Sequence, residues 1–170
     1  LTNYSNIARD CGVDSKTIKS YYQILEDTLF GYFVRPFTAK RGRQVLSSTP
    51  KFYLFDVGVA GYLANRHLSD LKGPEAGHAF EHYLLMELVA YRGLKERRDE
   101  ICYWRTRSGL EVDFVIGDAQ VAIEVKLSQK VEKTDLRGLT SFLDDHPDAH
   151  AYVVSLDPRP RKVTLASGHT

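Results

Sequence analysis

Two neighbouring segments, residues 110–116 and 121–127, place the strongest constraint on how this sequence can fold. In both segments apolar residues occupy alternate positions, which is typical of β-strands. Residues 117–120, which begin with Gly117, predict a turn between the strands and therefore a hairpin. The hairpin fixes which side chains can lie together.

Alternation along these two strands predicts which side chains share a face of the sheet. Asp113 belongs to the face opposite to that of Val112 and Phe114. In the hairpin, Asp113 and Glu124 can face the same side, and Lys126 lies two residues beyond Glu124 on that face.

Two carboxylates that lie close together repel each other, and a divalent cation bound through oxygen relieves that repulsion. The cation would be Mg²⁺ or Mn²⁺, and it would stabilise the transition state of phosphodiester hydrolysis. The candidate catalytic residues are therefore Asp113, Glu124 and Lys126, with the two acids as metal ligands and the lysine orienting water or phosphate. The alternative is a solvated strand face with an ordinary ion pair.

A predicted helix at residues 79–91 offers a third candidate metal ligand, Glu81. Leu84, Leu85 and Leu88 follow it at helical spacing, so Glu81 lies in line with an apolar stripe. A carboxylate in that position should be paired or bind a ligand. The alternative is a carboxylate near the start of the helix, where the helix dipole favours it.

The front of the chain predicts a helix-turn-helix followed by a hairpin wing. We expect helices at 6–11, capped by Ser5, and at 16–27, capped by Ser15, and strands at 31–37 and 51–55 joined by a basic loop at 38–44. The alternative is a small helical subdomain that packs against a protein partner. The candidate DNA-binding residues, on the second helix and the wing, are Lys16, Lys19, Lys40, Arg41 and Arg43.

The rest of the chain predicts a second domain with a mixed sheet. Residues 69–78 contain Gly73-Pro74 and predict the boundary, which divides the chain into a winged-helix-like segment, 1–72, and a rear domain, 73–170. After the helix at 79–91 the rear domain has the order αβββαβ, so the expected fold class is α/β (α+β). Its elements after that helix are predicted at 101–105, 110–116, 121–127, 134–144, 151–156 and, as a final strand, 162–165.

Composition indicates a globular protein without a membrane span. The chain has 170 residues, 43% of them hydrophobic, and no apolar run long enough to cross a bilayer. We expect that it has no signal peptide and that its two distant cysteines are free thiols, and we therefore expect a cytoplasmic location. Because the sequence does not begin with Met, we expect it to be an excised fragment.

Several of these residues together resemble a known pattern. Phe80-Glu81, Glu111-Val112-Asp113-Phe114 and Ile123-Glu124-Val125-Lys126 resemble the PD-(D/E)XK nuclease-like pattern. With Lys51–Gly58 and Tyr103–Thr106, the chain resembles the C-terminal region that follows a P-loop ATPase module in a prokaryotic AAA-type ATPase family. The match covers residues 1–128 well and the remainder loosely.

The resemblance implies a restriction-endonuclease-like core after a winged-helix-like segment, with the chain's own N-terminal ATPase module as a partner. The chain has no G-x-x-x-x-G-K-[ST] motif, so ATP would bind only through that missing module. Two functions follow from the resemblance. One is a Mg²⁺- or Mn²⁺-dependent DNA nuclease. The other is a non-catalytic DNA- or protein-binding module that regulates the ATPase.

A second motif overlaps the first. His78-Ala79-Phe80-Glu81-His82 has the H-x-x-E-H spacing of inverted zinc peptidases, which puts two imidazoles on one helix face. No other element clearly offers a third zinc ligand, so chance occurrence is the competing interpretation.

Overall fold

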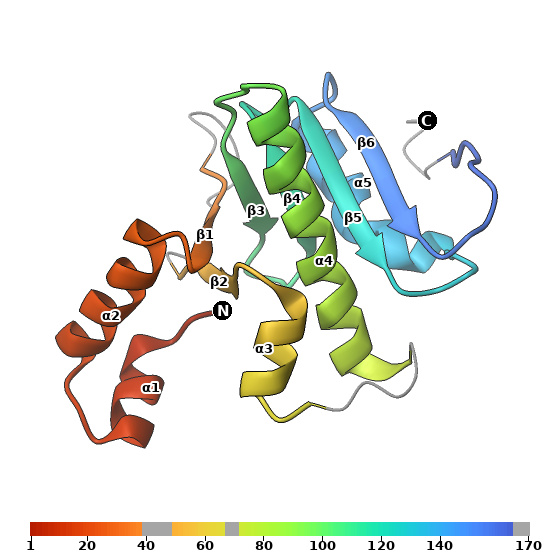
Figure 1. Cartoon of the computed structure of the whole chain (residues 1–170). Helices are drawn as coiled ribbons and strands as arrows, with labels where there is room; N and C mark the ends of the chain where they lie inside the picture. The colour runs from red at the N-terminus through yellow and green to blue at the C-terminus, as the bar shows by residue number, and fades with distance from the viewer. Residues whose placement is uncertain (39–48, 67–71, 165–170) are drawn as a thin grey trace.

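The protein is described by a computed structural model that covers residues 1–38, 49–66 and 72–164 (Figure 1). These residues form a mixed α+β fold, as predicted. The helices are α1 (Tyr4–Cys11), α2 (Ser15–Asp27), α3 (Val57–Leu63), α4 (Gly73–Leu94), the 3₁₀ helix η1 (Lys133–Leu136) and α5 (Arg137–Asp145). The strands are β1 (Gly31–Pro36), β2 (Lys51–Leu54), β3 (Ile101–Arg105), β4 (Glu111–Ile116), β5 (Val121–Lys126) and β6 (His150–Ser155).

One six-stranded sheet contains all of these strands, in the order β2-β1-β3-β4-β5-β6. The pairs β1–β3 and β5–β6 are parallel and the other pairs are antiparallel. The predicted wing hairpin, β1–β2, therefore belongs to the front segment (residues 1–72) and extends the sheet of the rear segment (residues 73–170). Arg35 and Pro36 of β1 pair with Cys102 and Tyr103 of β3.

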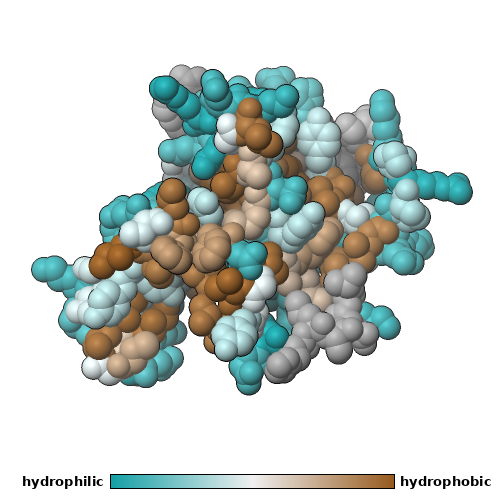
Figure 2. Space-filling view, in the orientation of Figure 1, coloured by the Kyte–Doolittle hydropathy of each residue, from teal (hydrophilic) through white to brown (hydrophobic). Residues whose placement is uncertain are grey.

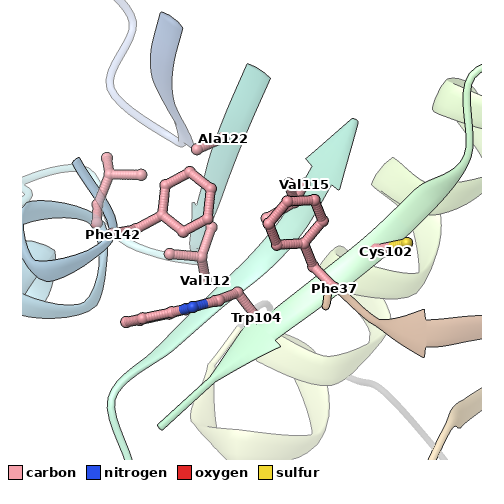
Figure 3. Close-up of a cluster of buried hydrophobic side chains, with 8 residues drawn as sticks. Phe37, Cys102, Trp104, Val112, Val115, Ala122 and Phe142 are labelled. Atoms are coloured by element: carbon pink, nitrogen blue, oxygen red, sulfur yellow. The ribbon is translucent and has the colours of Figure 1, made fainter. Parts of the chain in front are cut away.

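Helices cover both faces of this sheet, with α4 across one face and α5 on the other (Figure 1). The α5 side holds a cluster that includes Phe37, Trp104, Val112 and Phe142, drawn in Figure 3. The α4 side holds a second cluster, which includes Val34, Leu85, Tyr103, Phe114 and Ile123. The front segment contributes Phe37 to one cluster and Val34 to the other, so both cores depend on it.

The two front helices form where they were predicted, but the predicted caps are wrong. Asn3, not Ser5, caps α1, and Asp14, not Ser15, caps α2 by accepting the backbone N–H groups of Lys16 and Thr17. Aspartate and asparagine are as favourable at this position as serine, so residue type alone did not identify the cap. Gly12 ends α1 with φ 67°, the left-handed conformation that glycine adopts readily.

Helix α4 begins earlier than predicted. It starts at Gly73 rather than Ala79, inside the segment expected to be a linker, and it continues to Leu94. Pro74 lies in its first turn, where the missing proline N–H costs nothing, so this proline starts the helix instead of interrupting a loop.

A final strand was predicted at residues 162–165, but residues 162–164 form no strand. Residue 165 lies outside the described residues. Among the residues that the structure describes, no helix has both the length and the apolarity that a membrane span requires.

Candidate metal and phosphodiester site

A β-bulge in β4 sets the position of Asp113. Cys102 of β3 pairs with Val115, whereas Trp104 pairs with Val112, so Asp113 and Phe114 together lie opposite Tyr103. The strict alternation predicted for this strand is therefore wrong: Val112 and Val115 pack in one cluster, and Phe114 packs in the other. A bulge redirects a side chain in this way. Asp113 Oδ2 accepts the backbone N–H of Val125 in β5, at 2.8 Å.

Glu124 and Lys126 lie on β5, where the predicted alternation is confirmed. Ile123 and Val125 pack on the α4 side, and Ala122 packs on the α5 side. Lys126 Nζ lies 2.6 Å from Glu124 Oε1, and the Glu124 side chain is only 6% exposed. Its other oxygen, Oε2, is buried and has no hydrogen-bond partner within the described part of the chain.

The two carboxyl groups hold their protons unusually strongly. Burial, together with the negative charge of Glu81, raises the pKa of Asp113 to about 6. Burial and the negative charge of Asp113 raise the pKa of Glu124 to about 8, although Lys126 opposes that rise. Burial is the largest cause for both residues, and the nearby lysines offset it only in part.

Glu81 lies in the third turn of α4 rather than at its N-terminus, because the helix begins at Gly73. The helix-dipole interpretation of this residue is therefore wrong. Its Oε1 atom is 2.8 Å from Lys51 Nζ and accepts the Tyr53 hydroxyl at 2.5 Å. Burial alone would raise the pKa of Glu81, but Lys51 and Tyr53 hold that pKa below its ordinary value.

Lys51 and Tyr53 are site residues that sequence reasoning missed. Lys51 Nζ also lies 2.6 Å from Glu111 Oε1, and Glu111 Oε2 is 3.2 Å from Arg105. Alternation in the predicted strand at 51–55 puts Lys51 and Tyr53 on one face, and this was the available signal. That signal does not say which part of the chain the face would meet.

The predicted metal ligands are therefore not gathered into one compact set. Among the described residues, no three His, Cys, Asp or Glu side chains are arranged to share a metal ion. Asp113 and Glu124 interact with each other, while Glu81 is held by Lys51 and Tyr53. Two carboxylates still suit Mg²⁺, which is commonly bound by one or two protein carboxylates with waters completing its shell. Glu124 Oε2, a buried carboxylate oxygen with no partner among the described residues, could serve as one such ligand.

The H-x-x-E-H motif does not assemble a zinc site. His82 is buried, and its Nε2 atom lies 2.7 Å from the carbonyl oxygen of Leu54. The side chain of His78 is 73% exposed, and its Nδ1 atom lies 3.9 Å from Glu81 Oε2. Both histidines therefore interact with neighbouring groups of the protein, and these contacts account for them without a zinc ion.

The candidate DNA-binding residues are only partly described. Lys16 and Lys19 are exposed on α2, and Lys19 Nζ lies 5.7 Å from the centre of the Tyr4 ring. The wing residues Lys40, Arg41 and Arg43 lie outside the described residues.

Comparison with known families gives two matches. Residues 76–165, just over half of the chain, match DUF4143, a domain of unknown function. Residues 1–70 match a second domain of unknown function, DUF8612. No curated protein and no solved structure matches the chain.

Proposed function

The chain belongs to the DUF4143 family of unknown function, and we propose that Asp113 and Glu124 bind one Mg²⁺ or Mn²⁺ ion for phosphodiester hydrolysis in DNA. Lys126 would assist that reaction as a member of a PD-(D/E)XK nuclease-like site. In the full-length protein this activity would be coupled to an N-terminal AAA-type ATPase module.

One observation carries the proposal: the buried Glu124 Oε2 atom has no partner within the described residues, and the negative charge of Asp113 acts on the same carboxyl group. Buried polar atoms are nearly always hydrogen-bonded, and an exception calls for an explanation. A cation would supply the missing partner and would remove the repulsion between Asp113 and Glu124. The ordinary ion pair of Lys126 with Glu124 engages only Oε1 and leaves this atom unexplained.

The chain's own residues would then have distinct roles. The Val125 N–H donates to Asp113 Oδ2 and orients this side chain, so Oδ1 would be the oxygen that contacts the ion. Lys126, at 2.6 Å from Glu124, would neutralise charge on a phosphate or orient the attacking water. The ion, when bound, would act as a Lewis acid and would lower the pKa of a bound water.

A cleavage assay with a matched pair of variants tests this proposal. Linear, single-stranded and branched DNA would be incubated with the chain in Mg²⁺ or Mn²⁺. We expect Asp113→Asn to abolish cutting and Asp118→Asn to leave it unchanged, because Asp118 is exposed in the turn between β4 and β5. Equal cutting by the wild type and Asp113→Asn would reject the assignment of Asp113.

A second candidate function, a non-catalytic module that docks on the ATPase, is favoured by exposed apolar side chains at the front of the molecule. Figure 2 shows hydrophobic surface in the region of α2 and α3. The large exposed hydrophobic side chains of α2, of the two residues before β1 and of α3 are Tyr21, Ile24, Leu29, Phe30, Tyr62 and Leu63. Patches of this kind mark interaction surfaces.

Amide hydrogen exchange tests whether the surface of α2 and α3 docks on the ATPase module. The amides of α2 and α3 should be protected in the full-length protein relative to the present chain. Equal exchange in both proteins would argue against docking at this surface.

A further inference from the structure

Four acids whose charges act on one another, Glu81, Glu111, Asp113 and Glu124, are named the acid cluster. A lysine from the front segment, Lys51, lies between two of them, Glu81 and Glu111. Lys51 lies on β2, and its side chain is only 12% exposed. Its ammonium group contacts Glu81 of α4 and Glu111 of β4, and it lies 5.3 Å from the centre of the Tyr103 ring. Burial alone would lower the pKa of Lys51, but the two carboxylates raise it above its ordinary value, so the group is charged.

Several further contacts keep this lysine in place. Tyr53, two residues along the same strand, donates its hydroxyl to the same Glu81 oxygen. The Tyr103 hydroxyl donates to the carbonyl oxygen of Thr49 at 2.6 Å, just before β2. His82 of α4 contacts the Leu54 carbonyl at the end of β2. Strand β2 is thus tied to α4 and β3 along its length, which fixes the Lys51 backbone beside the acids.

The four acids consequently divide into two pairs. Glu81 and Glu111 share Lys51, which lies between them at distances typical of strong charge-assisted contacts. The charge of Lys126 acts on both Asp113 and Glu124, but within the described residues its ammonium group pairs with Oε1 of Glu124 and leaves Oε2 without a partner. Lys51 therefore supplies to Glu81 and Glu111 the positive charge that a bound cation could also supply.

We propose that Lys51 is a positioning residue whose ammonium group fills one of two cation positions in the acid cluster and thereby limits the cluster to a single divalent ion. This inference rests on the proposed function, because it takes Asp113 and Glu124 as the pair that binds the ion. It goes further in assigning a residue of the front segment to the site.

The test counts ions and does not use nuclease activity. Mn²⁺ binding would be measured by electron paramagnetic resonance of the free ion, for the whole chain and for Lys51→Met. This substitution keeps an unbranched apolar chain one atom shorter than that of lysine and removes the ammonium group. We expect one ion for the wild type and two for the variant. Lys130→Met is the matched control and should bind one ion, because it removes the same charge from the exposed ion pair with Glu132.

Two outcomes of this test separate the role of Lys51 from the proposed function. If Lys51→Met binds one ion with unchanged affinity, the role of Lys51 is wrong and the proposed function still stands. If the wild type binds no ion and Lys51→Met binds one, the role of Lys51 stands and the proposed function falls. If neither binds, both fall.

The folding of the variant provides a second measurement. Without the charge of Lys51, the Lys51→Met protein should unfold at a lower temperature than the wild type. Mn²⁺ should raise the unfolding temperature of the variant more than that of the wild type. If the variant is unfolded without metal, Mn²⁺ should restore its circular dichroism spectrum. An absence of recovery at saturating Mn²⁺ would overturn the proposal.

Discussion

Burial and neighbouring negative charge make Asp113 and Glu124 hold their protons to higher pH than exposed carboxyl groups do. Their ordinary pKa values are 3.8 and 4.5, and in the folded chain they rise to about 6 and about 8. At pH values between the ordinary and the raised pKa of each group, the folded chain binds more protons than the unfolded chain. The stabilisation from these protons is therefore complete below pH 4 and is lost as the pH rises towards 8.

We therefore expect the metal-free protein to become less stable between pH 5 and pH 8, by at most about 1.4 kcal/mol per pH unit for each group. Glu124→Gln should flatten this dependence, because the amide stays neutral throughout. The measurement is urea unfolding in the presence of a chelator at several pH values. A wild type as stable at pH 8 as at pH 5 would contradict the assigned shifts.

At the level of single residues, the sequence was sufficient to select Asp113, Glu124, Lys126 and Glu81 as candidates, because residue type and local alternation indicated them. It did not identify Lys51 as their neighbour. That contact spans 30 positions to Glu81 and depends on β2 lying beside α4, which no local pattern encodes.

At the level of elements, the bounds of β3, β4 and β5 were predicted within one residue, since apolar alternation marks strands directly. The bulge in β4 was not predictable from that alternation. It is a property of the pairing between β3 and β4, where two residues of one strand oppose one of the other.

The start of α5 has a strict size limit at Gly138. A Cβ atom there would overlap the backbone carbonyl oxygen of Glu111 in β4, so α5 could not approach the sheet as closely. We expect Gly138→Ala to lower the free energy of unfolding by about 1–3 kcal/mol or more. Gly93→Ala in α4 meets no atom and should instead stabilise the helix by up to about 1 kcal/mol. Equal unfolding midpoints for the two variants in urea would contradict this packing.

Helix α2 carries the described part of the predicted DNA contact. If Lys16 and Lys19 each neutralise one phosphate, changing both to Ala should weaken binding uniformly across DNA sequences and reduce the salt slope by about 2. Fluorescence anisotropy at several salt concentrations measures both quantities. An unchanged slope would remove α2 from the DNA surface.

At the level of the whole molecule, the front and rear segments share one sheet and two hydrophobic cores. Val34 and Phe37 are buried in the clusters on opposite faces of the sheet, and burial of each such side chain is worth about 1.5–3 kcal/mol. A fragment of residues 73–170 should therefore unfold at a clearly lower temperature than the whole chain. A fragment with the same melting temperature and a well-dispersed NMR spectrum would show that the rear segment is independent.

The central claim is that Asp113 and Glu124 hold a divalent ion, and a crystal soaked with Mn²⁺ tests it most directly. Anomalous scattering locates manganese without any assumption about activity. We predict one strong peak bounded by the carboxylates of Asp113 and Glu124, with Glu124 Oε2 among its ligands. A map at saturating Mn²⁺ with no peak there, or with manganese only elsewhere on the chain, would contradict the account.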